Sequence, residues 1–205
     1  MNIDKSHYYD GKFYEIFIDR ALKEVRDIIV EQIEADSTVV DIGCGTGSLV
    51  FDLAEKCELV TGIELSSKMV IHAQRRQQSN GNSNVNFIHG DSKSLPHFQD
   101  QQFDYATISM AIHEMPPDLR MQVLNDAKRI AKKIIIADYV VPQPLNFAGI
   151  ITRIVEFLAG IEHFRGFRDF QRNNGIYQLL QNCQLSICGE STNKNGTIRV
   201  VVAQQ

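Results

Sequence analysis

One stretch decides the fold, Val39-Val40-Asp41-Ile42-Gly43-Cys44-Gly45-Thr46-Gly47-Ser48-Leu49. A short β-branched run there enters a glycine-rich turn, and the residues after the turn have helical apolar spacing. Glycine tolerates positive φ and lets a ligand approach the backbone closely. In open α/β sheets ligands bind at this carboxyl edge, where the amides that start the helix are free. The stretch therefore predicts a ligand site, although a tight turn without a ligand has the same local sequence.

The spacing of the glycines separates two classes of cofactor. A dinucleotide fingerprint has the form G-x-G-x-x-G. Counted from Gly43, the third position is Ser48, and counted from Gly45 it is Val50. The observed pattern is D-x-G-x-G-x-G, starting at Asp41. A nicotinamide oxidoreductase is therefore disfavoured.

The rest of the chain alternates short apolar runs with amphipathic stretches, which is typical of an α/β domain. Strands are expected at residues 38–42, 58–63, 85–88, 103–108, 133–137, 185–188 and 197–203. Helices are expected at residues 13–33, 47–56, 66–78 and 117–132, and over 146–183 with breaks at Gly149, Gly160, Gly166 and Gly175. The last two strands are joined by too short a turn for a crossover helix, so they should be antiparallel. The prediction is a seven-stranded, mostly parallel sheet closed by a C-terminal antiparallel hairpin.

Composition indicates one globular domain. The chain has 205 residues, of which 43% are hydrophobic and 22% charged, close to average usage in soluble proteins. No apolar run approaches the ~20 residues that cross a bilayer, and no signal-peptide pattern is present, so a cytoplasmic protein without an integral membrane segment is expected. The four cysteines include no CxxC pair, which argues against a metal site or disulfide framework. A net charge of -4 disfavours nucleic acid as a partner.

Two acidic residues follow the next strands at the same edge. Glu64 ends the second strand, and a carboxylate there can accept both hydroxyls of a ribose. Asp91 follows the third strand and could accept a hydrogen bond from an exocyclic amine. A solvated strand-end acid and an ordinary turn aspartate are the alternatives for the two positions.

Together these motifs resemble those of the class I S-adenosylmethionine-dependent methyltransferases. The matching segments are Asp41–Gly47, Glu64-Leu65-Ser66, and Gly90-Asp91 with Ser94-Leu95-Pro96. The most similar branch is the small-molecule one that includes the ubiquinone and menaquinone biosynthesis enzymes. The resemblance covers residues 8–205 and implies a Rossmann-like fold with helices on both faces of the sheet. It also implies S-adenosyl-L-methionine as cofactor and S-adenosyl-L-homocysteine as product.

The resemblance implies a cofactor site. Its expected members are Tyr14, Asp41, Gly43, Cys44, Gly45, Glu64, Leu65, Met69, Asp91, Ser92 and Ser109. Asp41 and the amides of residues 43–45 would hold the methionine part, and Glu64 would bind the ribose hydroxyls. Leu65 and Met69 would flank the adenine, although Met69 suits the core of its helix equally well.

The remaining members are placed by the same resemblance. Asp91 and the Ser92 amide would bind the adenine amine. Ser109 and Met110, which end the fourth strand, would sit near the transferred methyl group. Tyr14 belongs to an aromatic segment that would cap the site, or that simply begins an amphipathic helix.

Methyl transfer requires a general base only when the acceptor must lose a proton. His113 follows the fourth strand and is the candidate catalytic residue, since its unperturbed pKa of ~6.5 suits proton abstraction. A histidine packed against the sheet is the alternative. Glu114 is expected to be a solvated loop acid. Asp138 follows the fifth strand without a second Asp or Asn beside it, so no metal is expected.

The domain is expected to span residues 1–205, with an N-terminal helical lid over 1–35 and a helical insertion over 146–182 that shapes the acceptor pocket. The arginines within 162–172 could bind an anionic acceptor, or face solvent while the phenylalanines beside them fill the core. The expected partner is a small-molecule acceptor, and a homodimer is compatible with the sequence. The alternative function is a non-catalytic cofactor-binding partner or sensor of the same fold.

Overall fold

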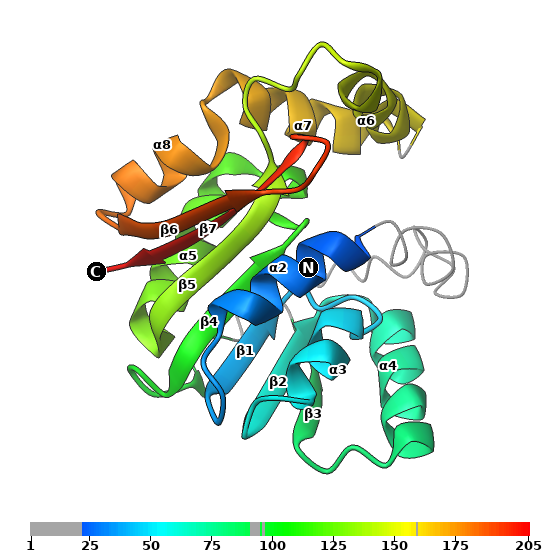
Figure 1. The fold of residues 1–205 in the computed structure, drawn as a ribbon, viewed down its shortest axis with the longest axis vertical. Coiled ribbons are helices and arrows are strands. Elements are labelled where there is room, and N and C mark those ends of the chain that lie inside the picture. Colours follow the sequence, from blue (N-terminus) through cyan, green and yellow to red (C-terminus); the bar gives the residue numbers. More distant parts are fainter. Residues whose placement is uncertain (1–21, 91–94, 96, 159) are drawn as a thin grey trace.

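Seven strands form one sheet in the computed structural model, which describes residues 22–90, 95, 97–158 and 160–205 (Figure 1). The strands are β1 (Thr38–Ile42), β2 (Leu59–Glu64), β3 (Val85–His89), β4 (Phe103–Ser109), β5 (Ala131–Tyr139), β6 (Ser186–Thr192) and β7 (Ile198–Gln204). Their order is β3-β2-β1-β4-β5-β7-β6, and β7 alone runs antiparallel to its neighbours β5 and β6. The predicted fold class is confirmed.

Helices lie on both faces of this sheet. One face packs against α2 (Lys23–Gln32), α3 (Ser48–Ala54) and α4 (Ser67–Asn80), and the other against α5 (Pro117–Ile130) and α8 (Gly175–Asn182). The helices α6 (Phe147–Leu158) and α7 (Ile161–Arg172) lie beyond the carboxyl ends of the parallel strands, at the top of Figure 1. A 3₁₀ turn, η3 (Ile112–Glu114), follows β4 and contacts α7. No helix in the described part of the chain is long and apolar enough to span a membrane.

The two cores follow from the period-2 alternation of side chains along each strand. In β5, Ile134 and Ile136 pack in the core under α5 and α8, whereas Ile135 and Ala137 pack in the core under α2 and α3. All four are fully or almost fully buried, as expected for a continuous apolar run in a strand covered on both faces.

Several predicted boundaries are corrected. The helix predicted to reach Lys132 ends at Ile130, because Ala131 pairs with Phe103 and already begins β5. The strand predicted over 185–188 continues to Thr192, paired with β7. The part of the first predicted helix that lies within the described residues is α2, and residues 13–21 lie outside them.

The glycines of the helical insertion divide into two kinds. Gly160, with a φ of +123°, separates α6 from α7, and Gly175 begins α8, as the sequence predicts. Gly149 and Gly166, however, lie within α6 and α7. A Cβ at Gly166 would come within 2.9 Å of the His113 carbonyl oxygen, so this glycine permits a close approach and does not break its helix.

Candidate functional site

The turn between β1 and α3 is tied to β2 by hydrogen bonds. The amides of Gly43 and Cys44 both donate to the Ile63 carbonyl oxygen, at 2.8 and 3.1 Å. The amide of Gly45 donates to Glu64 Oε2 at 3.0 Å. These three N–H groups are therefore engaged by β2, and the turn presents its peptide surface to a ligand.

Gly45 is the least crowded of the three glycines in this turn. Gly43 and Gly47 are closed by neighbours, since a Cβ would lie 3.1 Å from Ala111 Cβ at Gly43 and 2.6 Å from the Phe87 ring at Gly47. At Gly45, where φ is +55°, the nearest atom in such a test is Met69 Sδ at 3.9 Å. The Gly45 backbone is thus left-handed, and an added Cβ would meet Met69 only at ordinary van der Waals distance. A glycine at such a position allows a ligand to approach the backbone.

Glu64 is held rigidly at the end of β2. Its Oε1 accepts from the Ser66 amide at 2.7 Å while its Oε2 accepts from the Gly45 amide. Burial raises the pKa of this carboxyl above its usual value, although the two backbone hydrogen bonds oppose the shift. Each carboxylate oxygen can accept a second hydrogen bond, so the two acceptor oxygens suit the pair of donating hydroxyls of a ribose.

Asp41 lies beneath the turn and is almost fully buried. It stands opposite Thr107 in the register of β1 and β4, and the Thr107 hydroxyl donates to its Oδ1 at 2.7 Å. Burial raises the pKa of the Asp41 carboxyl to about 7, against the lowering effect of Thr107. A cation bound here, such as the ammonium of a methionine group, would favour the carboxylate form.

The other predicted residues are placed as follows. Met69 is buried beside Gly45, and its amide donates to Ser66 Oγ at 3.5 Å, so that Ser66 caps the N-terminus of α4. Leu65 and Ser109 are half-buried at the ends of their strands. Met110 follows β4 with a φ of +53°, a conformation uncommon outside glycine.

Tyr14, Asp91 and Ser92 lie outside the described residues. Their predicted roles, like those of the residues placed above, stay predictions.

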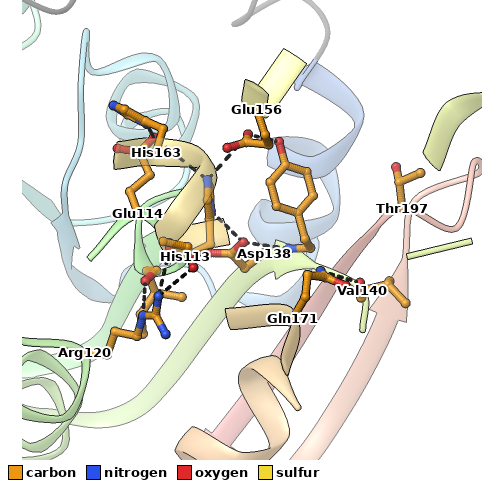
Figure 2. A network of polar contacts seen from close by, with 12 residues as sticks. His113, Glu114, Arg120, Asp138, Val140, Glu156, His163, Gln171 and Thr197 are labelled. Carbon is orange, nitrogen blue, oxygen red and sulfur yellow. Dashed lines mark hydrogen bonds and ion pairs between the residues drawn. The ribbon is translucent and has the colours of Figure 1, made fainter. Parts of the chain in front are cut away.

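A second group of polar side chains lies beside this edge, under α6 and α7 (Figure 2). We call it the His113 cluster, and its members are His113, Glu114, Asp138, Tyr139, Glu156 and His163. His113 Nδ1 lies 2.8 Å from Asp138 Oδ1, and the Tyr139 hydroxyl donates to Glu156 Oε1 at 2.7 Å. The second imidazole nitrogen, Nε2, faces Glu156 at 3.7 Å and Glu114 at 3.9 Å.

The charge of His113 follows from these neighbours. Burial alone would lower the pKa of the imidazole, but the Asp138 carboxylate, with Glu114 and Glu156, raises it to about 9. Asp138 is itself fully buried and also accepts from the His113 and Tyr139 amides. At neutral pH the imidazole is therefore protonated, a state in which it donates hydrogen bonds and cannot accept a proton.

Two members of the cluster, Glu114 and Glu156, differ from what the sequence predicts. Glu114 is wrong as a solvated acid, because its side chain is only 25% exposed and faces His113 and His163. Glu156 was not anticipated, although a lone acid in the apolar run 147–158 is a detectable signal. Its Oε2 is buried and has no hydrogen-bond partner among the described residues. Within those residues no group of three or more His, Cys, Asp or Glu side chains is arranged to hold a metal ion.

A buried arginine fixes the turn that carries His113. Arg120, on α5, is 2% exposed and donates to the carbonyl oxygens of Ile112, His113 and Gly166 at 3.0 to 3.1 Å. It also forms an ion pair with Asp169 at 2.7 Å. One guanidinium thus joins α5, η3 and α7, and nothing in the sequence marks it.

The predicted alternatives for the arginines of α7 are also resolved in part. Arg165, Arg168 and Arg172 are exposed, while Phe167 and Phe170 are buried. Of the two predicted alternatives, these positions match the one that places the arginines in solvent and the phenylalanines in the core, although Phe164 is only half-buried.

Comparison with known proteins agrees with this geometry. Residues 39–133 match a family model described as a methyltransferase domain. The demethylmenaquinone methyltransferase of Geobacillus stearothermophilus is 30% identical over 131 residues, covering 62% of this chain and 55% of the relative. That of Bacillus subtilis is 27% identical over 106 residues, covering 50% and 44%. The chain spans about half the length of the curated relatives it matches.

Solved structures share the fold at low sequence identity. A SAM-dependent methyltransferase from Aquifex aeolicus matches with a TM-score of 0.69 and 16% identity, covering 95% of this chain and 98% of that one. The [4+2]-cyclase SpnF matches with a TM-score of 0.69 and 17% identity, covering 91% and 81%. These likenesses concern the fold alone, on which different activities occur. The family match thus marks residues 39–133 as similar to a methyltransferase domain, and the fold of the whole sheet is the Rossmann-like fold of the solved methyltransferases.

Proposed function

We propose that this chain transfers a methyl group from S-adenosylmethionine to a small-molecule acceptor. The observation that carries the proposal is the pairing of the left-handed, uncrowded backbone of Gly45 with the Glu64 carboxylate, which accepts from the Gly45 amide. The sulfonium supplies an already activated methyl group when the cofactor is bound. The residues of the chain then have to hold the cofactor, orient the acceptor and exclude water.

Support for a small-molecule acceptor comes from the relatives, which are named for demethylmenaquinone. This quinone is therefore the first acceptor to test, in its reduced form. The residues that would contact an acceptor lie in the His113 cluster, at the carboxyl end of β4 and β5. The predicted lid over 1–35 and insertion over 146–182 are part of the same proposal.

The protonation of the cluster bears on the role of His113. A general base must be unprotonated, and the carboxylates around His113 favour its cationic form. Glu156 offers a buried carboxylate oxygen without a described partner, and its pKa is raised by burial. Within this proposal Glu156 is the group that takes a proton from an acceptor, while the nearby imidazole of His113, 3.7 Å away, lowers the pKa of Glu156 electrostatically.

Replacing Glu64 with alanine should weaken binding of S-adenosylhomocysteine about 10- to 100-fold, since hydrogen bonds to a charged group contribute about 1.5–3 kcal/mol. Isothermal titration calorimetry measures this. Glu58→Ala is the matched control, because Glu58 is an exposed glutamate at the opposite end of β2. Equal affinities in the two folded variants would contradict the assignment of Glu64.

The affinity for S-adenosylhomocysteine should depend on pH through Asp41. Its carboxyl has a pKa of about 7 in the free protein, and a bound ammonium requires the carboxylate. Binding should therefore weaken about tenfold from pH 8 to pH 6, as the protonated fraction rises. Calorimetry across this range measures the effect, and Asp41→Asn should remove the dependence. A dependence that persists in Asp41→Asn would assign it to another group.

A further inference from the structure

Helix α6 is oriented with its polar side chains inward. Glu156 is buried and bonded to Tyr139, and Arg153 donates to the Gln143 carbonyl oxygen. The outward side chains are apolar and are each between 42% and 78% exposed: Phe147, Ile150, Ile151, Ile154, Val155, Phe157 and Leu158. A helix at the surface of a globular domain normally shows the opposite arrangement.

The exposed apolar side chains are concentrated at this one place. Leu145 and Ile161, which flank α6, are exposed as well. Elsewhere in the described residues the exposed large apolar side chains are Leu59, Ile71 and Ile187, each on a different element. Single apolar side chains at a surface are ordinary, whereas a contiguous patch marks an interaction site.

Positive charge borders this patch. The exposed side chains of Arg165, Arg168 and Arg172 recur along one face of α7 at helical spacing. The rings of Phe157 and Phe164, 5.5 Å apart, pack α6 against α7, and Arg168 lies over the Phe164 ring. The acid Asp169 is paired with Arg120. The whole chain has a net charge of -4, so this cationic border runs against the overall charge.

We propose that the outward face of α6, with the arginine edge of α7, binds the surface of an anionic lipid bilayer. Apolar side chains of an interfacial helix enter the boundary between headgroups and acyl chains, while adjacent cations meet anionic headgroups. A second copy docked through the same face would present the same apolar side chains of α6 and the same arginines, and so would supply no anion from α6 to these cations. The charge pattern therefore favours the lipid surface over a second copy.

This inference goes beyond the proposed function and does not depend on it. Glu156 lies on the inner face of α6, so a bilayer on the outer face would place the His113 cluster next to the lipid (Figure 2). A lipophilic acceptor could then reach the cluster without crossing bulk water.

Co-sedimentation with vesicles tests the proposal. The unmodified chain should sediment with vesicles of phosphatidylcholine mixed with phosphatidylglycerol, and much less with phosphatidylcholine alone. The double variant Phe147→Ser, Ile154→Ser should weaken the partitioning roughly tenfold or more. Neutralising Arg165 and Arg168 with glutamine should weaken it about fivefold for each arginine, and added salt should reduce the binding of the unmodified chain.

Matched controls come from α4, far from this face. Ile71→Ser removes an exposed apolar side chain and Arg75→Gln an exposed arginine there, and both should leave partitioning unchanged. Absence of binding to the anionic vesicles would overturn the proposal. A second outcome would also overturn it: light scattering shows that the unmodified chain is a dimer, the Phe147→Ser, Ile154→Ser variant is a monomer, and neither binds vesicles. The affinity of the same α6 and α7 variants for S-adenosylhomocysteine, measured by calorimetry, tests cofactor binding independently of vesicle binding. This affinity should be unchanged.

Discussion

Replacing Arg120 with leucine is expected to lower the free energy of unfolding by about 3–5 kcal/mol. The substitution removes the guanidinium hydrogen bonds to the carbonyl oxygens of Ile112, His113 and Gly166, of which that of Ile112 still accepts from the Met115 amide. It also leaves Asp169 without its ion pair. Chemical denaturation followed by circular dichroism measures the loss.

Two controls separate this effect from the loss of any arginine. Arg172→Leu removes an exposed arginine from α7 and should change stability by no more than about 0.5 kcal/mol. Arg120→Lys keeps the charge but cannot reproduce the planar fork that reaches three carbonyls, so it should restore only part of the stability. A full rescue by lysine would show that the charge alone matters.

The His113 imidazole should titrate near pH 9, with Asp138 responsible for most of the upward shift. In Asp138→Asn the carboxylate is gone, and burial should bring the pKa of His113 below its ordinary value of ~6.5. Nuclear magnetic resonance of the imidazole protons follows the titration directly. A pKa that stays near 9 in Asp138→Asn would assign the shift to Glu114 and Glu156.

The same shift predicts how stability depends on pH. A folded-state pKa above the unfolded value contributes stability that is complete below about pH 6.5 and is lost as the pH rises through 9. The loss attributable to His113 is about 3 kcal/mol. Asp41 affects stability at lower pH. Because its folded-state pKa is raised to about 7, the folded protein keeps this carboxyl protonated while the unfolded chain ionises it, so stability falls as the pH rises from about 4 to 7. Denaturation between pH 7 and 9 therefore isolates His113, and Asp138→Asn should abolish the decline.

Sequence patterns were sufficient for the architecture of the sheet. The apolar run at Ile134–Ala137 predicts a buried strand, and the turn after Gly43 predicts a strand followed by a helix. Both predictions succeed because periodicity and turn chemistry are local properties of the sequence. The end of α5 was less predictable. Lys132 and Lys133 continue a good helical sequence, but pairing of Ala131 with Phe103 starts β5 earlier. Pairing between residues so far apart in the chain cannot be predicted from a short stretch of sequence around either of them.

Only those residues of the site that lie at or just after the carboxyl ends of strands could be predicted from the sequence. Glu64 and His113 each follow a strand, and the parallel order places such residues at one edge. The partners of His113 are harder to find. Asp138 lies near the carboxyl end of β5 at the same edge, yet its role as a hydrogen-bond acceptor for the imidazole depends on the exact path of η3. Glu156 and Arg120 reach the cluster from helices whose packing angles no local pattern specifies.

The place of β7 in the sheet has a consequence for how the protein is made. β7 lies between β5 and β6, yet it follows both of them in the chain. Until residues 198–204 emerge, β5 presents an unpaired edge along its length. Between the synthesis of β5 and that of β7 the sheet therefore stays open at this edge, and the nascent chain is then exposed to pairing with other chains.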